Sequence, residues 1–237
     1  MKKILNTLLL LALSAGAIIS QDHLANFYEV DRALISIHRY VTESNYQLTK
    51  ESIQSAENIW NIERSKLDSS HECSAVEQLN LCNIDGLFAI LSMQLERNSY
   101  PALDNYLMEL VAELRDLRLS TGIETYPIDH LWMAYGHYQE VHLTVHDQMF
   151  GLREWFEFED MVNGVGESLD AYSMLDDSTF HINYPEIDIK KHTEMKDKLN
   201  ECFLNFIYSL DSGYTPDFEW PCDELGLALY DLILLYE

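Results

Sequence analysis

The chain has 237 residues, 47% of them apolar, which is enough for one sizeable folded domain and argues against disorder. Forty acidic residues against 15 basic residues give a net charge of −25. A surface of this charge repels phosphate backbones and anionic lipids, which argues against nucleic-acid binding, and it attracts metal ions or cationic partners.

Residues 1–20 have the composition of a secretory signal peptide. Two lysines precede an apolar stretch that is too short to span a bilayer, and small residues follow it. The small residues favour cleavage after Ala17 or after Ser20. We therefore expect a secreted or periplasmic protein whose mature chain, 21–237, has no stable membrane anchor.

Four helices are expected in the first half of the chain, each from apolar residues at three- and four-residue steps. The side chains expected to point inward are Phe27, Val30, Leu34, Ile37 and Val41 in the first helix, Ile53, Ala56, Trp60 and Leu67 in the second, and Val76, Leu79, Phe88 and Leu91 in the third. The fourth helix has the clearest stripe, formed by Leu103, Leu107, Leu110, Leu114 and Leu117. Ser99 and Pro101 are suited to its start.

The helix that follows begins near Pro127 and carries a cluster of histidines. After it, residues 152–162 predict a short helix. Gly164 and Gly166 are expected to interrupt the helical pattern there, because glycine is a poor helix former.

Two more helices are expected near the end of the chain, over 189–210 and 222–237, with a loop at 211–221 between them. The last one is apolar on most sides, so we expect it to be buried. No alternating strand pattern occurs. The sequence therefore predicts an all-α fold of about seven helices in a single bundle-like domain, with a subdivision near 164–188 as the alternative.

The mature chain has an even number of cysteines, Cys73, Cys82, Cys202 and Cys222, which predicts two disulfides in an oxidising compartment. Nine residues of helix would separate Cys73 from Cys82 by about 13 Å, whereas a disulfide needs about 4.4–6.8 Å between Cα atoms. The loop-like sequence around Cys73 favours the local pairings, Cys73–Cys82 and Cys202–Cys222, among the three arrangements that four cysteines allow.

The segment 136–147, GHYQEVHLTVHD, holds three histidines and a glutamate. At 100° per residue, His137 and His146 point in opposite directions, so one ion cannot bind all three histidines. His142 and His146 are four residues apart, the spacing at which one helix face offers two imidazoles to zinc or copper. A third ligand must come from another helix, and His38 is the candidate.

Other features of this segment limit the metal hypothesis. The stretch HLTVHDQ resembles the H-x-x-x-H-R-G-Q segment of DinB-like four-helix metal bundles, but it lacks the Arg-Gly pair. Leu143 occupies the position where a zinc-protease helix has its glutamate. The alternative is that His142 is a core histidine bonded to a tyrosine or a backbone carbonyl, with His146 half exposed.

The sequence contains no complete catalytic constellation, which favours a binding role over an enzyme. The most concrete hypothesis is an exported acidic helical protein that binds a cationic protein partner. The alternative is a metal-binding bundle in which His142, His146 and a third ligand hold zinc or copper. We expect no other cofactor.

Overall fold

The computed structural model describes residues 27–70, 74–123, 126–147, 155–175, 184 and 186–237. These residues form eight helices and no strand. The first helix spans 27–42, and the others are α2 (Tyr46–Ser70), α3 (Ala75–Glu96), α4 (Tyr100–Ser120), α5 (Pro127–Val145), α6 (Trp155–Ser173), α8 (Ile189–Leu210) and α9 (Thr215–Leu234). The prediction of a single all-α domain is confirmed, while the predicted signal peptide at 1–20 lies outside the described residues.

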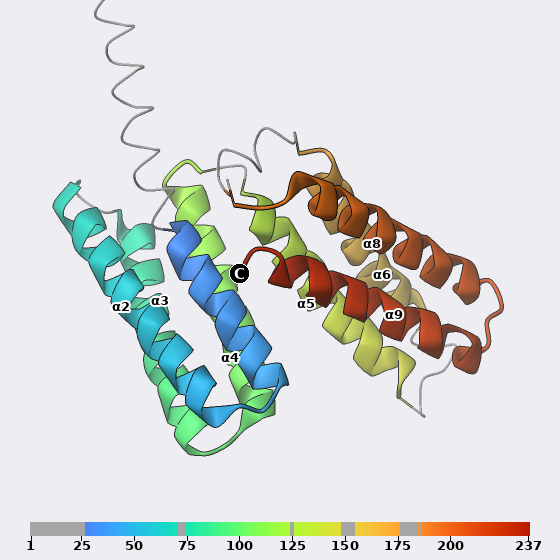
Figure 1. Ribbon diagram of the computed structural model, residues 1–237, viewed down its shortest axis with the longest axis horizontal. Coiled ribbons are helices and arrows are strands. Elements are labelled where there is room, and N and C mark those ends of the chain that lie inside the picture. Colours follow the sequence, from blue (N-terminus) through green and yellow to red (C-terminus); the bar gives the residue numbers. More distant parts are fainter. Residues whose placement is uncertain (1–26, 71–73, 124–125, 148–154, 176–183, 185) are drawn as a thin grey trace, which may run out of the picture.

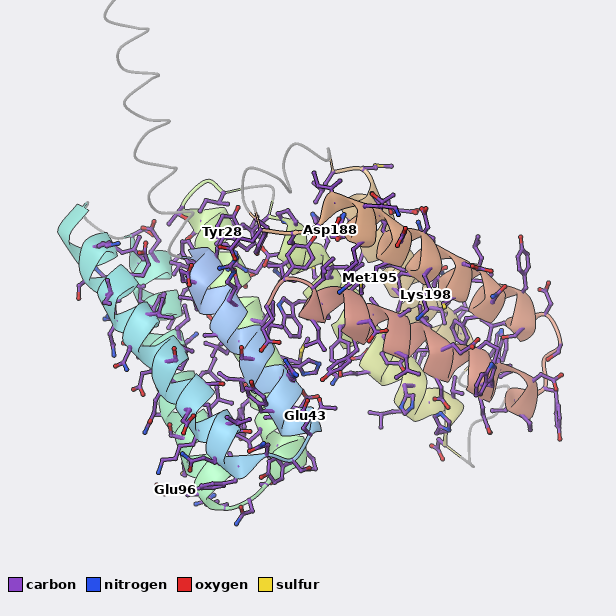
Figure 2. The ribbon with its side chains drawn as sticks, in the orientation of Figure 1. Tyr28, Glu43, Glu96, Asp188, Met195 and Lys198 are labelled. Atoms are coloured by element: carbon purple, nitrogen blue, oxygen red, sulfur yellow. The ribbon has the colours of Figure 1, made fainter. Side chains whose placement is uncertain are left out.

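The helices lie in two groups (Figure 1). Helix 27–42, α2, α3 and α4 form one group, and α5, α6, α8 and α9 form the other. Figure 2 labels Tyr28 and Glu43 at the two ends of helix 27–42, which lies along the seam between the groups. Of the stretch 164–188, residues 164–173 belong to α6 in the second group. Across the part of the chain that is described, no helix has both the length and the apolarity that a membrane span requires.

The seam contains a buried ion cluster that joins helix 27–42 to α4 and α5. The Arg118 guanidinium donates to Asp129 and, over 3.4 Å, to Asp31. It also lies 4.2 Å from the centroid of the Tyr126 ring, whose hydroxyl donates to Asp31. Burial raises the pKa of Asp31 to about 6, and the Arg118 charge opposes this rise.

The predicted core stripes of helix 27–42, α2 and α4 are confirmed, since every residue named for them is buried. In α3 the prediction is wrong for Val76 and Leu79, which are 61% and 60% exposed. The packing face of α3 is set by Leu81, Ile84, Phe88 and Leu91. Because each residue turns a helix by about 100°, the first two turns of this face are occupied by Glu77 and Asn80. A capping box holds the Glu77 side chain in this position.

Two other helix predictions are corrected. Helix α6 continues through Gly164 and Gly166, because these glycines are sites of close packing: a Cβ on Gly164 would lie 2.9 Å from the His137 ring. Helix α9 begins at Thr215, so most of the predicted loop at 211–221 is helical. A proline in the first turn fits this start, because the first backbone N–H groups of a helix have no partner within it.

The predicted Cys202–Cys222 disulfide is not formed, and Cys82 is also a free thiol. Burial, with a smaller contribution from the Glu224 charge, raises the pKa of the Cys202 thiol. Cys73, the predicted partner of Cys82, lies outside the described residues.

Candidate metal centre and adjoining groove

Helix α5 packs between α6 and α9 and carries the histidine segment (Figure 1). Its core-facing side chains include Leu131, Tyr138, Val141 and Val145, all buried. This packing fixes the rotation of the helix. The side chain of His142 is thereby directed towards α9, with that of His146 one turn further along.

Two histidines and one carboxylate converge between α5 and α9. The Nε2 atoms of His142 and His146 lie 3.2 and 3.0 Å from Oδ1 of Asp223. The two imidazole centroids are 4.4 Å apart, and the three donor atoms lie within 4.8 Å of one another. The side chains are 40%, 36% and 48% exposed, so an ion from solvent can reach them.

Sequence reasoning missed Asp223, which is 77 residues from His146. Neighbouring residues in the sequence give no sign of its role, because it depends on how α9 packs against α5. His38, the candidate third ligand, is buried elsewhere and its Nδ1 lies 3.0 Å from Oδ1 of Asp104. The structure therefore places a carboxylate, rather than a third imidazole, beside the predicted histidine pair.

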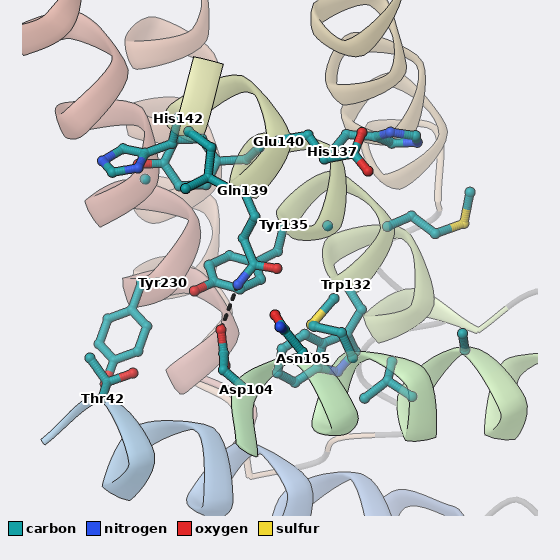
Figure 3. Close-up of a pocket in the computed structure, with 18 of the residues that line it drawn as sticks. Thr42, Asp104, Asn105, Trp132, Tyr135, His137, Gln139, Glu140, His142 and Tyr230 are labelled. Atoms are coloured by element: carbon teal, nitrogen blue, oxygen red, sulfur yellow. Dashed lines mark hydrogen bonds between the residues drawn. The ribbon is translucent and has the colours of Figure 1, made fainter. Parts of the chain in front are cut away.

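The expected divergence of the histidines around α5 is observed. His137 packs against Gly164 of α6, and Figure 3 shows it on the opposite side of α5 from His142. The alternative of a core histidine does not describe His142, which is half exposed and contacts a carboxylate. Its ring lies beside that of Tyr138, with centroids 5.7 Å apart.

The cysteine next to Asp223 is not available as a fourth donor in its ordinary state. Cys222 is fully buried, and burial, with a smaller contribution from the Asp223 charge, raises the pKa of its thiol to about 12. The thiol is therefore protonated at neutral pH, whereas metals bind the thiolate. The donor set consists of two imidazoles and one carboxylate.

A groove of about 1020 Å³ adjoins the cluster and is lined by α4, α5, α9 and Thr42 (Figure 3). His142 and Asp223 are among its lining residues. Further along, the Asp104 carboxylate accepts hydrogen bonds from Gln139 and, in one tautomer, from His38. The groove lies where the two helix groups meet, a common location for ligand sites.

Comparison with known proteins gives no family for this chain. No protein-family model matches it, and neither curated proteins nor solved structures give a match. The short resemblance of HLTVHDQ to DinB-like bundles is therefore unaccompanied by a family match.

Proposed function

We propose that this protein binds a divalent transition-metal ion, Zn²⁺ or Cu²⁺, through His142, His146 and Asp223. The observation that carries this proposal is the approach of both imidazole Nε2 atoms to one carboxylate oxygen, at 3.2 and 3.0 Å. In a tetrahedral site with bonds of about 2.0–2.2 Å, neighbouring donor atoms are about 3.3–3.6 Å apart. Small rotations of these exposed side chains would reach that spacing.

The chemistry of the donors supports the choice of metal. Imidazole with carboxylate suits zinc and copper, whereas calcium prefers six to eight oxygen ligands. Three protein ligands leave a fourth position for water or another ligand, the arrangement found in catalytic zinc sites. Since His142 and Asp223 line the groove, that position would be open to solvent. The net charge of −25 also raises the local concentration of cations.

The test is calorimetric titration of untagged, metal-free protein with Zn²⁺ and with Cu²⁺. We expect one ion per chain for the wild type and no such site in His142→Ala/His146→Ala. Asp223→Asn should bind at least about tenfold more weakly, because even outer partners of metal ligands contribute about 10- to 100-fold.

His130→Ala is the matched control, because His130 lies on α5 outside the three-donor cluster. The His130→Ala variant should bind Zn²⁺ and Cu²⁺ as tightly as the wild type does. Equal binding by the wild type and the double variant would refute the proposed site.

A second candidate function is binding of a cationic protein by an exported acidic protein, with residues 1–20 as the export signal. Besides the net charge, a set of exposed aromatic side chains at the junction of α8 and α9 supports it: Tyr208, Tyr214 and Trp220 are 68%, 61% and 68% exposed. Asp211, Asp217 and Glu219 are interspersed with them in the sequence. Aromatic rings beside carboxylates offer both apolar area and opposite charge to a basic surface.

A further inference from the structure

We propose that the groove between α4, α5 and α9 binds an organic cation, an ammonium group carried on an apolar body. This inference concerns the Asp104 part of the groove and does not depend on metal binding. It rests on the charge of the lining, on the environment of Asp104 and on the aromatic side chains around it.

The charge of the groove lining is strongly one-sided. Among the described residues that line it, the acidic ones are Asp104, Asp129, Glu140 and Asp223, and Arg115 is the only Lys or Arg. Asp129 is already bound by the buried arginine of α4, and Arg115 pairs with the acid that follows it in the chain. The groove therefore presents a net negative field, which favours a cation over a neutral or anionic ligand.

Asp104 is suited to anchor the ammonium group. Its side chain is 22% exposed, and among the described residues it has no ion pair with a lysine or arginine. Its oxygens interact with His38 and with the neutral amide of Gln139. A carboxylate has about four acceptor positions, so positions remain for a ligand N–H.

Aromatic rings surround this carboxylate (Figure 3). Tyr135 and Tyr230 lie with ring centroids 4.8 and 5.4 Å from that of His38, the imidazole bonded to Asp104. Burial and the Asp104 charge together raise the pKa of Tyr135, which is consistent with its closeness to the carboxylate. Aromatic faces attract ammonium groups, and the apolar lining, which includes Met108 and Leu143, can cover the body of the ligand.

The same chemistry could come from a free amine or from a lysine side chain of a basic protein. The first experiment compares 2-phenylethylammonium with 2-phenylethanol and 3-phenylpropionate by calorimetry, with EDTA present to remove metal ions. The ammonium probe should bind at least about tenfold more tightly than the alcohol, and the carboxylate should not bind. A blocked Gly-Lys-Gly peptide and its Nε-acetylated form distinguish the sources: tighter binding of the lysine peptide than of the amine indicates a protein partner, and binding of the amine alone indicates a small molecule.

A pair of variants locates the binding. Asn105→Arg adds a positive charge and bulk at an exposed position of the groove, and Asn61→Arg makes the same change on an exposed position of α2 that does not line it. Asn105→Arg should weaken binding of the ammonium probe at least about tenfold, and Asn61→Arg should leave this binding nearly unchanged. Equal binding of the alcohol and the ammonium, or equal effects of the two variants, would overturn the proposal.

Discussion

At Gly226, the backbone of α9 lies so close to α5 that the Tyr138 ring occupies the space where a side chain would begin. A Cβ built on Gly226 overlaps the Tyr138 hydroxyl and ring, and Tyr138 is only 8% exposed. This contact brings α9 against α5 within one turn of Asp223. Glycine at this position therefore contributes to the approach of Asp223 to the two histidines.

We predict that Gly226→Ala destabilises the protein by about 1–3 kcal/mol, because the extra methyl group must displace a buried ring. Gly86→Ala is the control: Gly86 lies in the middle of α3, and outside its own helix backbone no atom of the described residues lies within 4 Å of its Cβ position. That change should stabilise the protein by about 0.5–1 kcal/mol through helix propensity. Urea unfolding of both variants measures the difference, and a neutral Gly226→Ala would show that Tyr138 moves aside freely.

Gly164 and Gly166 show why the predicted interruption of α6 is wrong. Glycine lowers helix propensity, so two glycines in three residues predict a break. Each glycine lets α6 pack closely against a neighbouring helix, Gly164 against His137 of α5 and Gly166 against Phe203 of α8. No local sequence pattern connects these residues. Tertiary packing outweighs a propensity difference of about 1 kcal/mol per glycine.

At the level of elements, the Arg118 cluster attaches helix 27–42 to α4 and α5. Arg118 is fully buried and faces two carboxylates, Asp31 and Asp129, together with the ring of Tyr126, on which Tyr28 stacks. One guanidinium cannot balance two buried carboxylates. Burial and, to a smaller extent, the charge of Asp129 favour the protonated form of Asp31, whose pKa is raised from 3.8 to about 6.

This raised pKa predicts a pH dependence of stability. A carboxyl whose pKa is higher in the folded than in the unfolded protein stabilises the fold in its protonated form. The contribution of Asp31 is therefore complete below pH 3.8 and is lost as the pH rises through about 6. Asp31→Asn cannot ionise, so we expect the wild type to lose stability relative to this variant between about pH 4 and 7.

Urea unfolding at several pH values measures this difference, with Asp116→Asn as an exposed control on α4. The control should show little change in its difference from the wild type over the same range. A constant difference between the wild type and Asp31→Asn would mean that Asp31 does not titrate there.

The elements also show how much of the candidate site was predictable. The pairing of His142 with His146 and the divergence of His137 follow from the rotation of one helix, which the sequence determines locally. Asp223 could not be predicted, because it joins the pair only through packing of α9 on α5. For the same reason, an all-α fold of about seven helices and most core stripes could be predicted from periodicity, but the division into two groups could not.

For the whole molecule, the net charge of −25 predicts how a cationic partner would bind. Its attraction should weaken as salt is added, because the Debye length falls from about 30 Å at 0.01 M to about 10 Å at 0.1 M salt. With lysozyme as a basic probe, we expect association that weakens steeply over this range.

If the junction of α8 and α9 provides the contact, Trp220→Ala should weaken the association with lysozyme. Leu119→Ala, which changes an exposed side chain on α4, should leave it unchanged. Salt-independent association would contradict an electrostatic origin.

The position of helix 27–42 along the seam has a consequence for the order of folding. The pairs α3–α4, α5–α6 and α8–α9 join neighbours in the sequence, whereas Asp31 meets partners 87 and 95 residues away and Ser36 bonds to a residue 201 positions away. Contacts that close such long loops form late, because the chain entropy must be lost before they are gained. Until this helix docks, its apolar stripe remains uncovered, and a chain arrested at that stage would be prone to aggregate.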